Sequence, residues 1–167
     1  RTSNYDGDWL PVVYPSPLRE PAHRAFPKVA EEWDMDRIVA AYADATARCR
    51  EAGLDGVETE AYTHLLDAFW SPLTNHRDDE FGGSLENRMS FPLRVIRAVR
   101  EAAGPDFAVG IRMSFDEEMP GGLGRDEALA IAHQVVAEGI DFISIIRGYM
   151  GSDEALSRVI PPMGTPV

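Results

Sequence analysis

The feature that most constrains the fold is a junction that occurs three times, in which a helix ends at a glycine and a strand follows. The three sequences are REAGLDGVE, EAAGPDFAVG and VAEGIDFIS, with the glycines at Gly53, Gly104 and Gly139. Glycine fits because the chain must leave a helix through a left-handed backbone conformation. Repeated helix–glycine–strand units predict parallel strands joined by crossover helices, which is an α/β fold.

Apolar periodicity predicts where the elements lie between these junctions. Asp34 and Ser84 are the expected N-caps of the first two helices. On the third helix, Leu129, Ala132, Val135 and Val136 are expected to face inward. The helices are expected at about 36–52, 84–103 and 126–138, and the strands at 54–59, 107–113 and 142–146. Residues 1–34 show no persistent period and are expected to be irregular, as a functional loop or as a segment without its neighbours.

The spacing of the glycines indicates a long loop after the first strand. They are 51 and 35 residues apart, and the surplus lies between Val57 and Asn87. In parallel α/β folds such strand-to-helix loops lie at the carboxyl ends of the strands, where ligands bind. No Gly-x-Gly-x-x-Gly follows a strand, which disfavours a dinucleotide-binding sheet. A complete (β/α)8 TIM barrel takes about 250 residues, so these 167 residues with three strands are expected to be part of one.

Composition excludes several classes of partner. Sixteen basic and 28 acidic side chains give a net charge of −12, which disfavours nucleic acid. No apolar stretch is long enough for a membrane span. The single cysteine, Cys49, cannot form an internal disulfide or a cysteine-built metal site, and the four histidines lack ligand spacing, so no metal is expected. A cytoplasmic setting is expected. The chain starts at Arg1 without a signal-peptide pattern, so it is expected to be a piece of a longer protein.

Polar side chains cluster where the predicted strands end. Glu58 and Glu60 flank one residue and should point to the same side, either at a site or into solvent. Tyr62 and His64 follow at once, and a phenol and an imidazole there suit proton transfer, although loop packing is an alternative. The sequence leaves these alternatives open.

Arginines end the second and third predicted strands. Arg112 interrupts an otherwise apolar strand, and Arg147 follows the next one. Each could bind an anionic or electron-rich ligand or form a structural salt bridge. Because both would face one mouth, the pair modestly favours a binding role.

The loop at 71–88, SPLTNHRDDEFGGSLENR, contains turn-forming proline and glycine and many polar side chains that can hold it rigid. This motif closely resembles the signature loop of the Old Yellow Enzyme-like flavin oxidoreductases. AGLDGVE before it and GPDFAVGIRMS after it match the same family in the right order, so the resemblance covers about residues 36–147. Within the family, the sequence is most similar to a branch of N-methylproline (proline-betaine) demethylases.

The resemblance implies a (β/α)8 barrel with FMN at the carboxyl ends of the strands. The three predicted strands then correspond to strands four to six, with residues 1–34 between strand three and its helix, βα units at 35–147, and a loop at 148–167. The FMN phosphate cradle would come from strands seven and eight, outside this chain. Any iron–sulfur cluster or second nucleotide-binding region, as in amine-dehydrogenase relatives, would lie downstream.

The resemblance also implies roles for residues. Arg112 matches the arginine that reaches the flavin and stabilises negative charge on the reduced ring. Glu60 replaces the first member of a His-x-x-His or His-x-x-Asn pair that holds an enone, and Tyr62 and His64 fall near the second member and a proton-donating tyrosine. A glutamate suits a cationic amine better than an enone. Arg147, by position alone, could meet a substrate carboxylate.

The leading hypothesis is therefore an FMN-dependent oxidoreductase that demethylates an N-methylated amine or amino acid by hydride transfer to the flavin. NAD(P)H or an electron-transfer protein would be a further partner. One alternative is an NAD(P)H-dependent ene-reductase or flavin reductase of the same fold. Another is a truncated, non-catalytic remnant, and the fragment alone is expected to be inactive.

Overall fold

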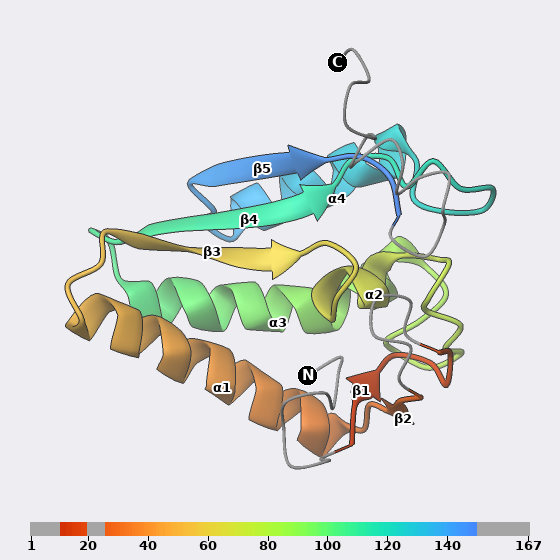
Figure 1. Ribbon diagram of the computed structural model, residues 1–167, viewed down its shortest axis with the longest axis horizontal. Helices are drawn as coiled ribbons and strands as arrows, with labels where there is room; N and C mark the ends of the chain where they lie inside the picture. Colours follow the sequence, from red (N-terminus) through yellow and green to blue (C-terminus); the bar gives the residue numbers. More distant parts are fainter. Residues whose placement is uncertain (1–10, 20–25, 150–167) are drawn as a thin grey trace, which may run out of the picture.

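The computed structural model describes residues 11–19 and 26–149, and the remaining parts of the expected segments 1–34 and 148–167 lie outside the described residues. Two short strands precede the first helix. Three longer strands then alternate with helices (Figure 1). In chain order the elements are β1 (Val13–Tyr14), β2 (Lys28–Val29), α1 (Glu32–Glu51), β3 (Gly56–Ala61), α2 (Leu66–Trp70), α3 (Leu85–Ala103), β4 (Ala108–Ser114), α4 (Arg125–Ala137) and β5 (Phe142–Ile146).

The main sheet is parallel and its strand order follows the sequence, β3-β4-β5. Figure 1 shows the three strands side by side, with α1 and α3 below them and α4 behind. The strand order contains no reversal of the kind that marks a doubly wound sheet. Right-handed crossovers that all advance in one direction place their helices on the same face of the sheet. The topology is that of successive parallel βα units.

The hydrophobic core fills the space between the sheet and the helices. Val109, Ile111 and Met113 of β4 are fully buried and pack against apolar side chains of α3 and α4. Gly110 and Arg112 alternate with them and belong to the opposite face, as the two-residue period of a strand requires. The opposite face of the sheet therefore carries the side chains available for chemistry.

The three predicted strands are present in the predicted order as β3, β4 and β5, with the first two shifted by one or two residues. The predicted N-cap at Asp34 is wrong, because α1 begins at Glu32 and Glu31 is its N-cap. The Asp34 carboxylate instead accepts a hydrogen bond from the Glu31 backbone amide and forms an ion pair with Lys28. At the second helix, Ser84 accepts from the Asn87 amide, so the predicted cap is confirmed.

Three features differ from the sequence-based expectation. The segment expected to be irregular contains the parallel β1–β2 pair, and the long loop contains α2. Leu129 and Val136 of α4 are half exposed, while Ala128 and Ile131 are buried. Apolar residues occur around most of α4, so periodicity alone could not say which of them face the sheet. Among the described residues no helix is long and apolar enough to cross a bilayer.

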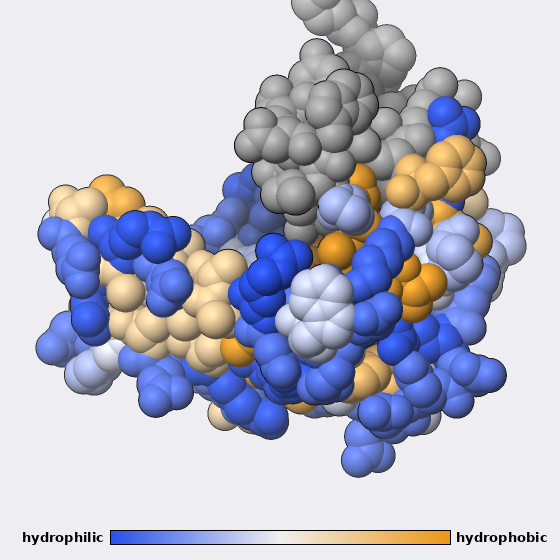
Figure 2. Space-filling model, turned by 90° about the horizontal axis from the view of Figure 1, so that it is seen from below, coloured by the Kyte–Doolittle hydropathy of each residue, from blue (hydrophilic) through white to orange (hydrophobic). Residues whose placement is uncertain are grey.

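Arginines on α3 join it to both neighbouring units. Arg94 pairs with Glu32 and Asp36 of α1, and Arg97 pairs with Glu138 after α4. Hydrophilic residues predominate on the face of the molecule seen from below (Figure 2). Exposed pairs of this kind contribute little to stability individually.

The loop between α2 and α3 is held by buried hydrogen bonds, as its polar composition predicted. The Asn75 side-chain amide donates to the carbonyl oxygens of Phe69 and Phe81, at 2.5 and 2.7 Å. Arg88, which is buried, donates to the Trp70 carbonyl and pairs with Glu127 of α4. A methyl group at Gly82 would lie 2.1 Å from the carbonyl oxygen of Arg77, so the backbone closes tightly there.

We expect Gly82→Ala to destabilise the protein by about 1–3 kcal/mol, the usual cost of forcing a group into a packed site. Urea unfolding of the whole protein measures the loss. Gly124→Ala is the matched control, because a methyl at Gly124 meets no atom within 4 Å, and it should cost about 1 kcal/mol or less. Equal losses in the two variants would contradict the close packing at Gly82.

Candidate active site

Charged side chains from neighbouring strands meet on the open face of the sheet. Arg112 on β4 lies opposite Glu60 on β3 and Ser144 on β5 in the strand register. Its Nη2 is 2.8 Å from Oε1 of Glu58, while its Nη1 is 3.9 Å from Oε2 of Glu60. The Ser144 hydroxyl donates to the other oxygen of Glu58. The structure therefore brings together the strand-end carboxylates and the arginine that the sequence analysis selected.

Glu60 combines partial exposure with a buried, unpartnered oxygen. Its side chain is 43% exposed, yet Oε1 is buried and has no hydrogen-bond partner among the described residues. Burial raises the pKa of Glu60, although the nearby Arg112 and His64 favour the ionised form. A carboxylate oxygen without a partner is costly in a folded protein. Such an oxygen is suited to accept a hydrogen bond from a ligand.

Tyr62 and His64 lie in a tight turn directly after β3. Between them Thr63 has a φ of 56°, a left-handed conformation that is rare for threonine. The Tyr62 hydroxyl is buried without a hydrogen-bond partner among the described residues, and burial raises the pKa of the phenol. Because strain and unsatisfied polar atoms concentrate at functional sites, the turn is a candidate for contact with substrate.

Asp67 holds this turn, a role that the sequence analysis missed. Its buried carboxylate accepts hydrogen bonds from the backbone amides of Thr63 and His64, the latter at 2.8 Å. Burial raises the pKa of Asp67 to about 6. The signal in the sequence was a single acidic residue inside the apolar run LLDAFW. Such a residue is buried only when local donors satisfy it.

A second buried carboxylate, Glu117, joins the loops that follow β3 and β4. Its Oε2 accepts from the Ser71 hydroxyl at 2.9 Å and from the Leu123 amide at 2.6 Å. Burial raises the pKa of Glu117 to about 6. The sequence analysis missed this residue too, because nothing in an acidic loop distinguishes one carboxylate that turns inward.

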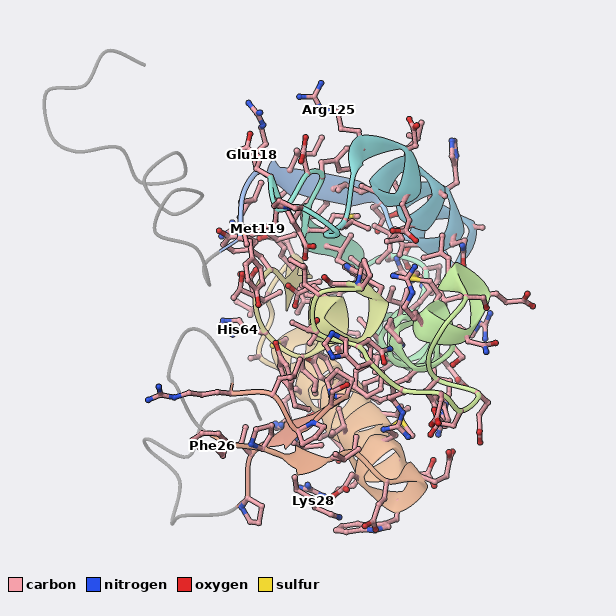
Figure 3. The ribbon with its side chains drawn as sticks, turned by 90° about the vertical axis from the view of Figure 1, so that its right-hand side faces the viewer. Phe26, Lys28, His64, Glu118, Met119 and Arg125 are labelled. Carbon is pink, nitrogen blue, oxygen red and sulfur yellow. The ribbon has the colours of Figure 1, made fainter. Side chains whose placement is uncertain are left out.

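Arg147 lies beyond β5 and forms an ion pair with Glu118. Its side chain is 60% exposed, so the guanidinium remains accessible. Figure 3 looks onto the carboxyl ends of the strands and shows His64, Met119 and Glu118 along one margin of the molecule. The loops after β3 and β4 therefore reach the same side.

A cavity of about 420 Å³ lies elsewhere, between the β1–β2 pair and the first half of α1. Trp33, Ile38 and Tyr42 contribute to its lining, and none of the site residues selected from the sequence does. Its charged groups are Lys28, Asp34 and Arg37, and Asp34 pairs with Lys28 at 2.8 Å and with Arg37 at 3.9 Å. Its chemistry therefore does not match that of the strand ends.

Comparison with known proteins relates the chain to flavin enzymes. A sequence profile of the NADH:flavin oxidoreductase / NADH oxidase family matches residues 2–153. The chain is 51% identical, over 98% of its length and 24% of the relative, to a protein of Rhizobium meliloti (strain 1021) named "Probable N-methylproline demethylase". It is 43% identical, over 99% of its length and 24% of the relative, to N,N-dimethylglycine/sarcosine dehydrogenase of Chromohalobacter salexigens.

A solved structure agrees with this relationship. The complex of 2-naphthoyl-CoA reductase with 2-naphthoyl-CoA superposes with a TM-score of 0.79 at 29% identity, over 85% of this chain and 22% of that one. The chain thus spans about a quarter of the length of each of these three proteins.

Glu117 should make stability depend on pH. Its pKa is about 6 in the folded protein against 4.5 for an ordinary glutamate, so the folded state binds more protons between these values. Stability from this group is therefore lost as pH rises from about 4.5 to 6, by about 2 kcal/mol. Urea unfolding at pH values from about 4.5 to 6 measures the free energy of unfolding. We expect this part of its decline with pH to be absent in Glu117→Gln. The exposed change Glu51→Gln is the control, and a Glu117→Gln profile parallel to wild type would contradict the assignment.

Proposed function

The chain belongs to the NADH:flavin oxidoreductase / NADH oxidase family, and from this premise we propose that its protein uses FMN to demethylate an N-methylated amine or amino acid. The observation that carries the proposal is the buried, unpartnered oxygen of Glu60 at the carboxyl end of β3. An anionic acceptor there favours a substrate that brings a positive charge and an N–H donor. The printed names of the two relatives support the same substrate class.

The residues present fit FMN as a cofactor. Arg112 is the residue proposed to hold the flavin, at its N1/O2 edge. A guanidinium carries five N–H donors, and Nη1 of Arg112 is too far from Glu60, at 3.9 Å, to be used in a hydrogen bond. With 44% of the side chain exposed, donors remain for an electron-rich ring. When bound, FMN would supply the acceptor for a hydride.

We place the three strands as strands four to six of an eight-stranded barrel. Sequential parallel order and helices on one face support this placement. The open face of the sheet would then line the barrel, and the carboxyl ends of the strands would form the mouth. The FMN phosphate and any further cofactor would be held by parts of the protein beyond this chain.

The residues around Glu60 suit oxidation of an amine. The Glu60 carboxylate would bind the substrate ammonium at Oε1 and orient its N-methyl group. The nitrogen must lose its proton before a hydride leaves the methyl carbon, because its lone pair forms the new C=N bond. Tyr62, at its hydroxyl, and His64 are the groups proposed to hold and move protons there.

Water then adds to the iminium carbon, and the C–N bond breaks to give formaldehyde and the demethylated amine. Where the substrate is an amino acid, its carboxylate would compete with Glu118 for Arg147. The 60% exposure of the Arg147 side chain supports this contact, and the exchange would leave the Glu118 carboxylate, which is only 8% exposed, without the guanidinium.

A second candidate is NAD(P)H-dependent reduction of an alkene by the same fold. The buried Tyr62 hydroxyl favours it, because a phenol can protonate the reduced substrate. The similarity to the solved structure of 2-naphthoyl-CoA reductase supports the same candidate. Glu60 opposes it, because a carboxylate repels the developing negative charge of an enone oxygen.

An anaerobic titration of the whole protein separates the two candidates. We expect N-methylproline to bleach the flavin absorbance and to release formaldehyde on turnover. Bleaching by NADPH alone, reversed by an enone, would instead establish the reductase. A protein without bound flavin would remove the basis of both proposals.

Glu60→Gln should raise KM for N-methylproline by about tenfold or more, because it removes a charge-assisted hydrogen bond. Steady-state formaldehyde release measures the change. The loss should be smaller for a neutral enone, if one is reduced at all. An unchanged KM for the amine would contradict the role of Glu60.

Tyr62→Phe should lower kcat by about 10²-fold or more, the usual contribution of a proton-transfer group. The melting temperature should stay the same or rise, because the variant removes a buried hydroxyl without a partner. A lower melting temperature with unchanged kcat would assign Tyr62 to loop packing instead.

A further inference from the structure

The two carboxylates beside Arg112 differ in how many partners they have. Glu58 uses both oxygens: Oε1 faces Nη2 of Arg112 at 2.8 Å and Oε2 accepts from the Ser144 hydroxyl. One glutamate side chain therefore ties together β3, β4 and β5. Its side chain is 26% exposed, against 43% for Glu60. Glu58 is a fixed group, and Glu60 keeps a free oxygen.

Position along the strand adds to this difference. Glu58 precedes Glu60 by two residues, which places it about 7 Å farther from the carboxyl end of β3. It lies opposite Gly110 in the register, and a methyl group at Gly110 would lie 2.2 Å from the Phe142 ring. The aromatic ring thus occupies the space beside Glu58 that a side chain on β4 would take. A ligand at the strand ends would meet Glu60 before Glu58.

We infer that Glu58 is a positioning residue, which anchors the Arg112 guanidinium and thereby keeps Glu60 free for a cationic substrate. The inference rests on the proposed function and deepens it, because it assigns different tasks to two carboxylates that look equivalent in the sequence. Ser144 supports Glu58 by holding its second oxygen. Neither residue needs to touch the substrate.

Geometry explains why the anchor matters. Nη1 of Arg112 is already 3.9 Å from Oε2 of Glu60, so a small rotation would bring the pair into hydrogen-bond contact. Without the Glu58 carboxylate, Glu60 is the remaining anion beside the guanidinium on this face of the described sheet. Arg112 would then turn to Glu60, neutralise it and leave the position from which it reaches the flavin.

The test uses the whole protein with Glu58→Gln, Glu60→Gln and the double variant. FMN affinity of the apoprotein is measured from quenching of flavin fluorescence, and KM for N-methylproline from formaldehyde release. We expect Glu58→Gln to weaken FMN binding by about fivefold or more, and Glu60→Gln to change it by less than about twofold. Each single variant should raise KM, and the double variant should be little worse than Glu60→Gln alone.

Ser144→Ala should weaken FMN binding in the same direction but by less. Glu101→Gln, which removes one exposed carboxylate from α3, is the control for charge and should leave both quantities unchanged. A purely structural role for Glu58 would lower the melting temperature of the apoprotein without changing FMN affinity. Unchanged FMN affinity, or KM effects that multiply in the double variant, would overturn the inference.

The FMN titration needs no substrate, so the two proposals can fail separately. Weaker FMN binding in Glu58→Gln, in a protein that does not oxidise amines, would support the anchoring of Arg112 and overturn the proposed function. Amine oxidation with FMN affinity unaltered by Glu58→Gln would support the proposed function and overturn the anchor.

Discussion

The parallel register of β3, β4 and β5 is the constraint on which the site depends. It places Glu60, Arg112 and Ser144 side by side on one face, at the edge where all three strands end. The same register places Thr59, Ile111 and Ile143 toward the helices. Since the side-chain period of a strand is two, a slip of one residue would bury the charges and expose the core. The register that buries the hydrophobic face therefore also fixes the position of the charged one.

Much of this arrangement could be predicted from the sequence. The glycine junctions mark helix ends that the structure confirms, with Gly53 and Gly139 at φ values of 80° and 90°. Alternation correctly placed Glu58 and Glu60 on the same face. The start of α1 was wrong because Asp34 matches a capping pattern that Glu31 completes from three residues earlier. Leu129 and Val136 were assigned inward because a helix with apolar residues around it carries no directional signal.

The polar interior of the loops could not be predicted, for a different reason. Asp67 and Glu117 are among many acidic residues in a chain with a net charge of −12, and composition cannot say which of them turn inward. Each of the two carboxylates accepts hydrogen bonds from backbone amides that only the folded loops bring close to it. Both pay a desolvation cost that raises their pKa to about 6. In return, the turn at Thr63 and the loop ending at Leu123 are held by charged acceptors, so the residues between them have defined positions.

Charge balance links this scaffold to the chemistry. Two glutamates beside one arginine leave the open face with an excess negative charge, in a chain that is itself acidic. Under the proposed function, such a face would attract a cationic amine and disfavour a substrate that develops an oxyanion. A single arginine serving both carboxylates equally would leave neither free, because its donors would be divided between them. The unequal distances, 2.8 Å to Glu58 and 3.9 Å to Glu60, resolve this competition in favour of the deeper carboxylate. On the proposed roles of Glu58 and Glu60, substrate preference would therefore depend on a residue that the substrate never contacts, since the Glu58–Arg112 pair would determine how much negative charge remains at the strand ends.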